Sequence, residues 1–165
     1  MPFISSPSEI VGELDTSYAP LLEITFLVNS TRRLLPCHID TGSQDTVVFT
    51  DINIALGIGL SFDLSPQAVR LERLLANNLP AYFLETSAVI EWFAPTPVTV
   101  LAPDPRTPPP PLPAPPTPTA HTSSARVLIG IPLLLGSTIT IDFPPLHGRV
   151  HVTPPPQSYV RPFPL

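Results

Sequence analysis

The amino-acid sequence predicts an all-β fold. Short apolar segments rich in β-branched and aromatic residues recur along the 165-residue chain, and turn-forming residues bound each of them. A hydrophobic fraction of 43% suits a well-buried sheet, and a chain of this length can bury a substantial core. The longest apolar run, VLIGIPLLLG at 127–136, is too short to cross a bilayer, which takes about 20 residues.

The segments with the composition of strands are, in chain order, 21–29, 32–39, 45–50, 87–93, 97–102, 137–143 and 148–153. One stretch follows different rules. In SPQAVRLERLLANN at 65–78, Ser65 can cap a helix, Pro66 suits the first helical position, and apolar residues follow at helical spacing. Local rules alone therefore predict a helix there.

Proline is the compositional outlier, with 26 residues. Many of the prolines lie at 102–125 and others at 153–165, and these segments lack the backbone N–H groups that helices and sheets need. We expect both segments to be polyproline II or disordered. The first one interrupts a domain, because the residues that follow it are too few to fold alone.

Composition excludes several function classes. A single cysteine, Cys37, rules out an internal disulfide and offers no pair of metal ligands, and we expect no metal or cofactor. Eight Lys and Arg residues against thirteen Asp and Glu residues make the chain acidic, which argues against nucleic acid as a partner. The N-terminal MPFISSPSEI has no signal-peptide pattern, so the expectation is a cytoplasmic protein without a membrane partner.

The motif that carries chemistry is Asp40-Thr41-Gly42-Ser43, which directly follows an apolar strand. A carboxylate is rarely buried there without a partner. An ordinary side-chain-capped turn between two strands would also explain the motif. A second segment, RVLIGIPLLLGSTITIDFPPLHGRVHV at 126–152, makes that simple explanation less favourable. Together the two segments resemble the two signatures of the retropepsin-like aspartic proteases.

This resemblance implies a closed β-barrel or sandwich with one short helix near the C-terminus. It implies a protease domain at 21–153 with the proline-rich loop 102–125 inside it, an N-terminal extension at 1–20 and a tail at 154–165. The apolar strand Leu128-Ile129-Gly130 would thread beside the active-site turn, and the short helix would follow.

The resemblance also implies the chemistry. Asp40 would be the catalytic carboxylate and would act with Asp40 of a second chain, because the sequence contains only one such motif. Two like charges about 3 Å apart share one proton. Gly42 would permit the tight turn, Thr41 would hydrogen-bond across the two-fold axis, and Ser43 would bond the outer oxygen of Asp40. The substrate would be a peptide or protein in extended conformation.

The family has a flap, a hairpin that covers the substrate, which maps to about 76–84. Its candidate residues are Asn77, Asn78, Leu79, Pro80, Ala81 and Tyr82. This mapping makes 68–75 the leading strand of the flap instead of a helix. The chain also departs from the family, because Ile131 and Pro132 stand where retroviral members usually carry a charged residue, often Arg, that braces the dimer.

Two functions from different classes follow. The first is a homodimeric aspartic endopeptidase, and the second is a catalytically silent scaffold with the same fold. The scaffold would present a polyproline segment, at 107–119, to a proline-reading domain; a passive, solvated insertion is the simpler interpretation of that segment. His38, close to Asp40 in sequence, is expected to face outward.

Overall fold

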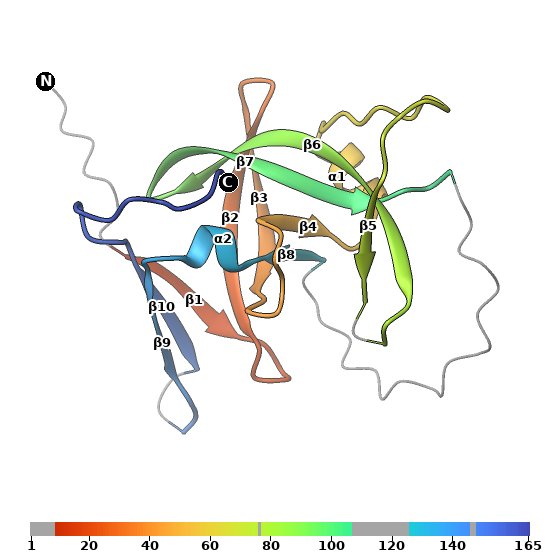
Figure 1. Ribbon diagram of the computed structural model, residues 1–165. Coiled ribbons are helices and arrows are strands. Elements are labelled where there is room, and N and C mark those ends of the chain that lie inside the picture. The colour runs from red at the N-terminus through yellow and green to blue at the C-terminus, as the bar shows by residue number, and fades with distance from the viewer. Residues whose placement is uncertain (1–8, 76, 107–125, 146–147) are drawn as a thin grey trace, which may run out of the picture.

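The structure is a computed structural model that describes residues 9–75, 77–106, 126–145 and 148–165 (Figure 1). Most of these residues lie in strands, and the two helices among them are short. The elements are β1 (Ile10–Leu14), β2 (Pro20–Val28), β3 (Thr31–Ile39), β4 (Val47–Phe49), α1 (Ile52–Gly57), β5 (Leu71–Leu74), β6 (Pro80–Trp92), β7 (Ala94–Pro103), β8 (Val127–Ile129), α2 (Ile131–Leu134), β9 (Thr138–Asp142) and β10 (Arg149–Thr153). The predicted all-β class is confirmed.

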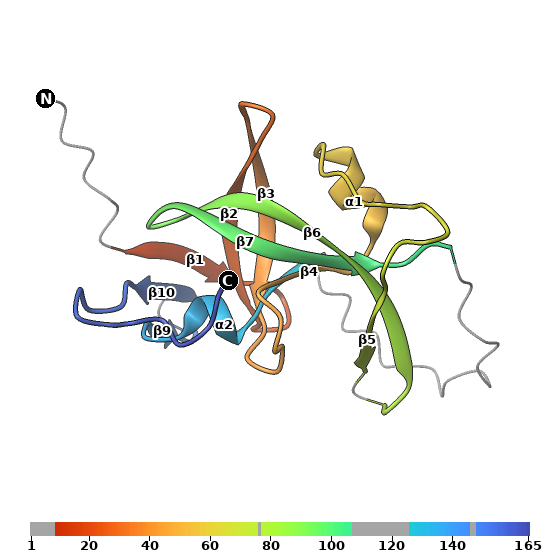
Figure 2. The ribbon, with the colours of Figure 1, turned by 45° about the horizontal axis from the view of Figure 1, so that its top comes forward.

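The strands form one sheet that closes on itself. Its order is β5-β6-β7-β4-β8-β3-β2-β1-β10-β9, and an additional pairing of β6 with β2 joins two of its inner strands. That pairing, with Phe26 opposite Ile90 and Leu27 opposite Val89, closes a barrel of six strands. The hairpin of β9 and β10 extends from the barrel beside β1, and β5 extends from its other end (Figure 2).

The core lies inside this barrel because its strands alternate buried and exposed side chains. On β2, Leu22, Ile24 and Phe26 are buried, and the intervening residues are more exposed. The Phe26 ring meets the Phe49 ring of β4 edge to face, with centroids 5.7 Å apart. Such pairs add specificity to apolar packing. The core therefore ties β2 to β4, the strand that follows the Asp40 turn.

The helix that local rules predict at 65–78 is wrong. Leu71–Leu74 form strand β5, which pairs antiparallel with β6 in a hairpin. Pairing with a neighbouring strand has outweighed a weak local helix preference. The sequence also left two elements unpredicted: β1, which lies in the expected N-terminal extension, and α1, whose first turn is capped by the Asp51 carboxylate through the Asn53 N–H at 2.9 Å.

The C-terminal segment 154–165 has neither helix nor strand, but it packs against the barrel. The Leu165 carbonyl oxygen accepts hydrogen bonds from the backbone N–H and the hydroxyl of Thr99, both at 3.0 Å. Arg161 donates to the Pro132 carbonyl oxygen at 2.8 Å. The proline-rich stretch at 107–125, including the suggested partner site at 107–119, lies outside the described residues. Within the described ranges, the helices are too short to cross a membrane.

Candidate active site

Asp40 lies directly after β3, at the start of a tight turn. Its backbone N–H donates to the Ile129 carbonyl oxygen at 2.8 Å. Its carboxylate Oδ1 accepts the Gly42 N–H at 2.9 Å, and the Ser43 N–H donates to its carbonyl oxygen at 3.2 Å. Asp40 is half-buried. Among the described residues, Gly42 is the hydrogen-bond partner of this carboxylate, so its remaining accepting capacity is not used there.

Strand β8 threads between the two strands that flank this turn. It pairs parallel with β3, with His38 opposite Leu128, and antiparallel with β4, with Val47 opposite Ile129. The segment after β8 continues the contact, because the Gly130 N–H donates to the Thr46 carbonyl oxygen at 2.9 Å. The structure thus brings Leu128, Ile129 and Gly130 beside the Asp40 turn.

Gly130 sits where no other residue fits. A Cβ atom built on it would lie 1.8 Å from the Asp45 carbonyl oxygen and 2.9 Å from that of Ser43. The Ile131 N–H in turn donates to the Ser43 carbonyl oxygen at 3.0 Å. The turn is therefore fixed by backbone contacts with the start of α2, and glycine is required by close approach of two backbones.

The hydroxyl of Ser43 has a different partner from the expected one. It donates to the Asp45 carbonyl oxygen at 3.2 Å and accepts the Asp45 N–H at 3.2 Å, and no bond to the carboxylate of Asp40 is seen in the described residues. A short side chain so close to its own backbone favours such local bonds. Thr41 is exposed at the apex of the turn.

The candidate flap is the hairpin of β5 and β6. Asn77, Asn78 and Leu79 form its turn, and Pro80, Ala81 and Tyr82 begin β6, with Pro80 opposite Leu74. The turn closes through the Leu75 N–H to the Leu79 carbonyl oxygen at 3.0 Å and the Asn78 N–H to the Leu75 carbonyl oxygen at 2.9 Å. Asn78 has a φ of 61°, which asparagine tolerates better than most residues. Proline in the flap is thus accommodated at the first position of a strand.

The prediction that His38 faces outward is wrong. His38 is only 6% exposed, and its Nε2 lies 2.8 Å from Oδ2 of Asp15 in the turn between β1 and β2. Residues two apart on a strand share a face, so His38 belongs on the side of Asp40. Burial alone would raise the pKa of Asp15, but hydrogen bonds from the Ala19 and Ser17 amides and from His38 lower it below its ordinary value.

Sequence reasoning also missed an ion pair beside the turn. Arg73 of β5 makes two hydrogen bonds to the carboxylate of Asp45, each at 2.9 Å. The residue types alone gave no signal for it, because 28 positions separate the two. The flap mapping, which assigns 68–75 to a strand, does not say which side chains this strand brings to the Asp40 turn.

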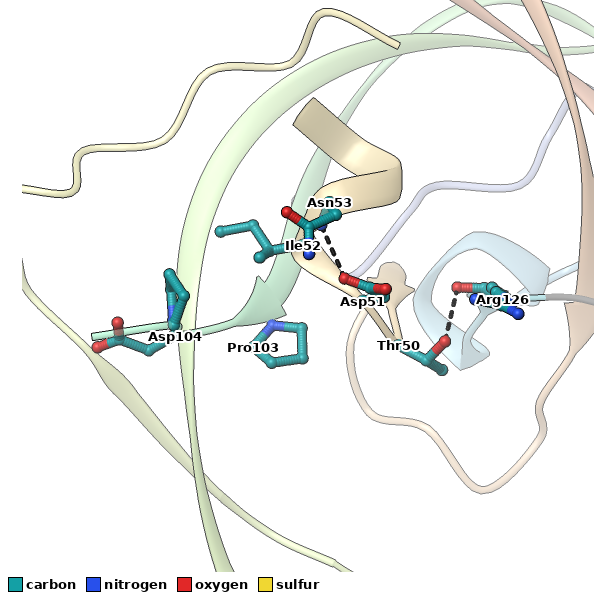
Figure 3. A pocket seen from close by; sticks show the side chains of 8 residues that line it. Thr50, Asp51, Ile52, Asn53, Pro103, Asp104 and Arg126 are labelled. Atoms are coloured by element: carbon teal, nitrogen blue, oxygen red, sulfur yellow. Dashed lines mark hydrogen bonds between the residues drawn. The ribbon is translucent and has the colours of Figure 1, made fainter. Parts of the chain in front are cut away.

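The cavity in Figure 3 is lined by residues that follow β4 and does not include the residues of the Asp40 turn. It measures about 630 Å³, and it is lined by residues around the start of α1, the end of β7 and Arg126. Its polar groups are partly engaged, since the Thr50 hydroxyl donates to the Arg126 carbonyl oxygen at 3.2 Å. The described residues contain no cluster of His, Cys, Asp or Glu that could hold a metal ion.

No model of a protein family matches the chain, and no curated protein matches its sequence. Among solved structures, the chain is similar to the crystal structure of a retropepsin-like aspartic protease from Rickettsia conorii, with a TM-score of 0.53 and 15% sequence identity. The likeness covers 87% of this chain and 89% of that one.

The fold is retropepsin-like. At 15% identity the likeness concerns the fold alone, so the role of each side chain rests on the geometry of the site. In this retropepsin-like barrel the turn at Asp40 joins β3 to β4. The backbone that follows β8 is hydrogen-bonded to this turn and to the residues after it.

Proposed function

We propose that the protein is an aspartic endopeptidase in which Asp40 from two copies of the chain forms the catalytic pair. The observation that carries this proposal is the state of the Asp40 carboxylate. It is half-buried, one of its oxygens is oriented by the Gly42 N–H, and the rest of its accepting capacity has no partner among the described residues. A carboxylate that is oriented by one hydrogen bond and otherwise open has free lone pairs with which to bind and activate water.

The reaction follows from the charge of such a pair. Two carboxylates that close together cannot both ionise easily, so they share one proton. The ionised carboxylate takes a proton from water as that water attacks the peptide carbonyl carbon, and the protonated one gives its proton to the carbonyl oxygen. In the resulting tetrahedral intermediate, the carboxyl that took the proton from water gives it to the nitrogen, and the C–N bond breaks as the amine leaves. The other carboxylate takes a proton from a hydroxyl of the intermediate as the new acid forms, so the pair again shares one proton.

The dimer is part of the proposal. The chain holds one Asp40 motif, and an isologous pair is the simplest assembly that brings two such turns together across a two-fold axis. Thr41, exposed at the apex of the turn, is positioned to contact its counterpart in that assembly. A strictly monomeric species that cleaves peptides would contradict this part of the proposal.

The decisive experiment replaces Asp40 with asparagine. Asp40→Asn removes the proton acceptor and the shared charge and keeps the shape of the side chain, so we expect complete loss of peptide cleavage by a dimer that still folds. Cleavage of a peptide library at several pH values measures activity, and size-exclusion chromatography measures assembly. Asp142→Asn on the outer strand β9 is a matched control, and it should cleave like the parent.

Two further readings of the same assay sharpen the result. Activity of the parent should fall at alkaline pH, because both carboxylates then ionise and no acid remains to protonate the substrate. A statine-type peptide, whose hydroxyl resembles the tetrahedral intermediate, should inhibit it. An Asn variant as active as the parent would reduce Asp40 to a turn residue. If neither form cleaves peptides or binds the inhibitor, the scaffold function replaces the protease.

A further inference from the structure

One ion pair joins the leading strand of the candidate flap, β5, to Asp45, in the loop that follows the Asp40 turn. The Arg73 guanidinium of β5 donates from Nε to Oδ2 of Asp45 and from Nη2 to Oδ1, both at 2.9 Å. Its Nη1 donates to the carbonyl oxygen of Glu72 at 3.0 Å. This two-pronged arrangement fixes direction as well as distance, which a lysine in the same place could not do.

Asp45 is held as firmly as the catalytic turn itself. Its backbone N–H and carbonyl oxygen both bond to the Ser43 hydroxyl, and its carbonyl oxygen lies against Gly130 so closely that a Cβ there would be 1.8 Å away. The position of the Asp45 carboxylate is therefore linked, through these contacts, to the position of the segment 40–43. Arg73, the other partner of the ion pair, lies on strand β5, which is less constrained.

Strand β5 is the last strand in the order of the sheet and pairs with β6. At its end Leu74 is 68% exposed and Leu75 is 44% exposed. Besides its pairing with β6, a short arm of this kind depends on side-chain contacts for its angle to the barrel. These include the ion pair of Arg70 with Asp104, 3.6 Å apart, and that of Arg73 with Asp45, and the second of these reaches the loop that follows the Asp40 turn. We propose that Arg73 is a positioning residue that holds the flap hairpin relative to the Asp40 turn by gripping Asp45.

The ion pair between Arg73 and Asp45 is weak enough to break and re-form. The side chains of Arg73 and Asp45 are 40% and 20% exposed, respectively, so the attraction is modest and salt weakens it. The hydrogen bonds to Asp45 raise the pKa of Arg73, and burial opposes them only in part; the charges of Asp45 and Glu85 add to the rise. The arginine therefore stays charged, and the ion pair opens by separation of the two groups. Such an ion pair biases the flap without locking it, as substrate entry requires.

The chain provides a matched control. Arg32 of β3 and Glu91 of β6 form another ion pair, with Nη2 and Oε2 2.8 Å apart. It joins two strands of the barrel, away from the Asp40 turn and from the flap turn. Loss of this pair reports what removing one partly exposed ion pair does to the fold in general.

Amide hydrogen exchange of the whole chain tests the proposal without any substrate. In Arg73→Gln and in Asp45→Asn, exchange at the flap amides of Leu75 and Asn78 should become threefold to tenfold faster, and the double variant should be no faster than either single variant. Arg32→Gln should leave these two amides unchanged. In 1 M salt the parent should approach the variants, because screening then weakens the pair.

The opposite results are equally clear. Unchanged exchange at the flap in Arg73→Gln overturns the proposal, and so does an equal acceleration in β2 and β3, which would mean general destabilisation. The inference deepens the proposed protease function, but exchange is measured without cleavage. If cleavage is also observed, Arg73→Gln should raise KM more than it lowers kcat. If cleavage is never observed and the exchange result holds, the ion pair stands and the protease proposal falls.

Discussion

Two turns in this molecule begin with the same pair of residues and have the same local geometry, but their surroundings differ. Asp15-Thr16-Ser17 follows β1, and Asp40-Thr41-Gly42 follows β3. In both, Oδ1 of the aspartate accepts the N–H of the residue two positions later, at 2.7 Å from Ser17 and at 2.9 Å from Gly42. Locally they are the same side-chain-capped turn.

Their surroundings separate them. Oδ1 of Asp15 accepts a second amide, from Ala19 at 3.0 Å, and Oδ2 faces His38, so its side chain is 8% exposed and both of its oxygens are engaged. The Asp40 carboxylate has one such bond among the described residues and stays half-buried. The comparison teaches that the turn itself does not make a carboxylate reactive. The number of partners that the fold supplies distinguishes the structural role of Asp15 from the chemistry that we propose for Asp40.

The largest effect should come from the backbone contact that supports only the Asp40 turn. Gly130→Ala would drive a methyl group to within 1.8 Å of the Asp45 carbonyl oxygen, so we expect a loss of more than about 3 kcal/mol of unfolding free energy or no folded protein. Denaturant unfolding followed by fluorescence of Trp92, the single and buried tryptophan, measures this loss.

Gly57 in α1 is the matched control, since a Cβ there would meet nothing within 4 Å. Gly57→Ala should leave stability unchanged or raise it slightly, because alanine favours helix. A Gly130→Ala protein as stable as the parent would show that the backbone contact between Gly130 and Asp45 is not tight. The explanation given for the Asp40 turn would then be wrong.

The second effect compares the two aspartates directly. Asp15→Ala removes the carboxylate that faces the buried His38 and takes the acceptor away from two amides, so a loss on the order of 3 kcal/mol is expected. Asp40→Ala removes one hydrogen bond at a half-exposed site and should cost less than about 1 kcal/mol. Parallel unfolding curves of the two variants measure the difference. Equal losses would erase the distinction between a structural and a reactive carboxylate.

The smallest effect is the change of the unfolding free energy with pH in the acid range. Hydrogen bonds from Arg106 lower the pKa of Asp104. Burial would raise the pKa of Asp15, but hydrogen bonds from the Ala19 and Ser17 amides and from the His38 side chain lower it. Each folded pKa lies below the unfolded value of about 3.9. The stability that these groups supply is therefore complete above that value and is lost as pH falls through the folded pKa.

Unfolding free energies between pH 2.5 and pH 6 test this sign. The parent should lose stability below about pH 4, and Asp15→Asn should show a flatter curve from a lower starting stability. A parent that gains stability in acid would contradict the sign. The outcome also bounds any assay of proteolysis, because the fold weakens at the acid end of the range.

The parts of the site that could be predicted are those encoded within a few neighbouring residues. The turn at 40–43 could be read because an aspartate and a glycine at that spacing specify it locally. Gly130 came from the resemblance of segment 126–152 to the second signature of the retropepsin-like proteases. The partner of Ser43 could not, since two acceptors lie within reach of one hydroxyl and only the folded turn selects between them.

Contacts between strands were out of reach for a different reason. The pairs of His38 with Asp15 and of Arg73 with Asp45 join positions 23 and 28 residues apart, and their existence depends on the register of strands that a single sequence leaves open. Leu71–Leu74 show the same limit, because the local signals there favour helix and pairing with β6 overrides them.

The contacts of strand β8 with the Asp40 turn also limit when that turn can be completed during synthesis of the chain. The bonds that complete the turn come from Ile129 and Ile131, so a growing chain that has not yet reached α2 lacks them. Strand β1 likewise waits for β10. Pairings between such distant segments form slowly because a long loop must first close. A nascent chain should therefore carry an unfinished Asp40 turn until synthesis has passed Ile131.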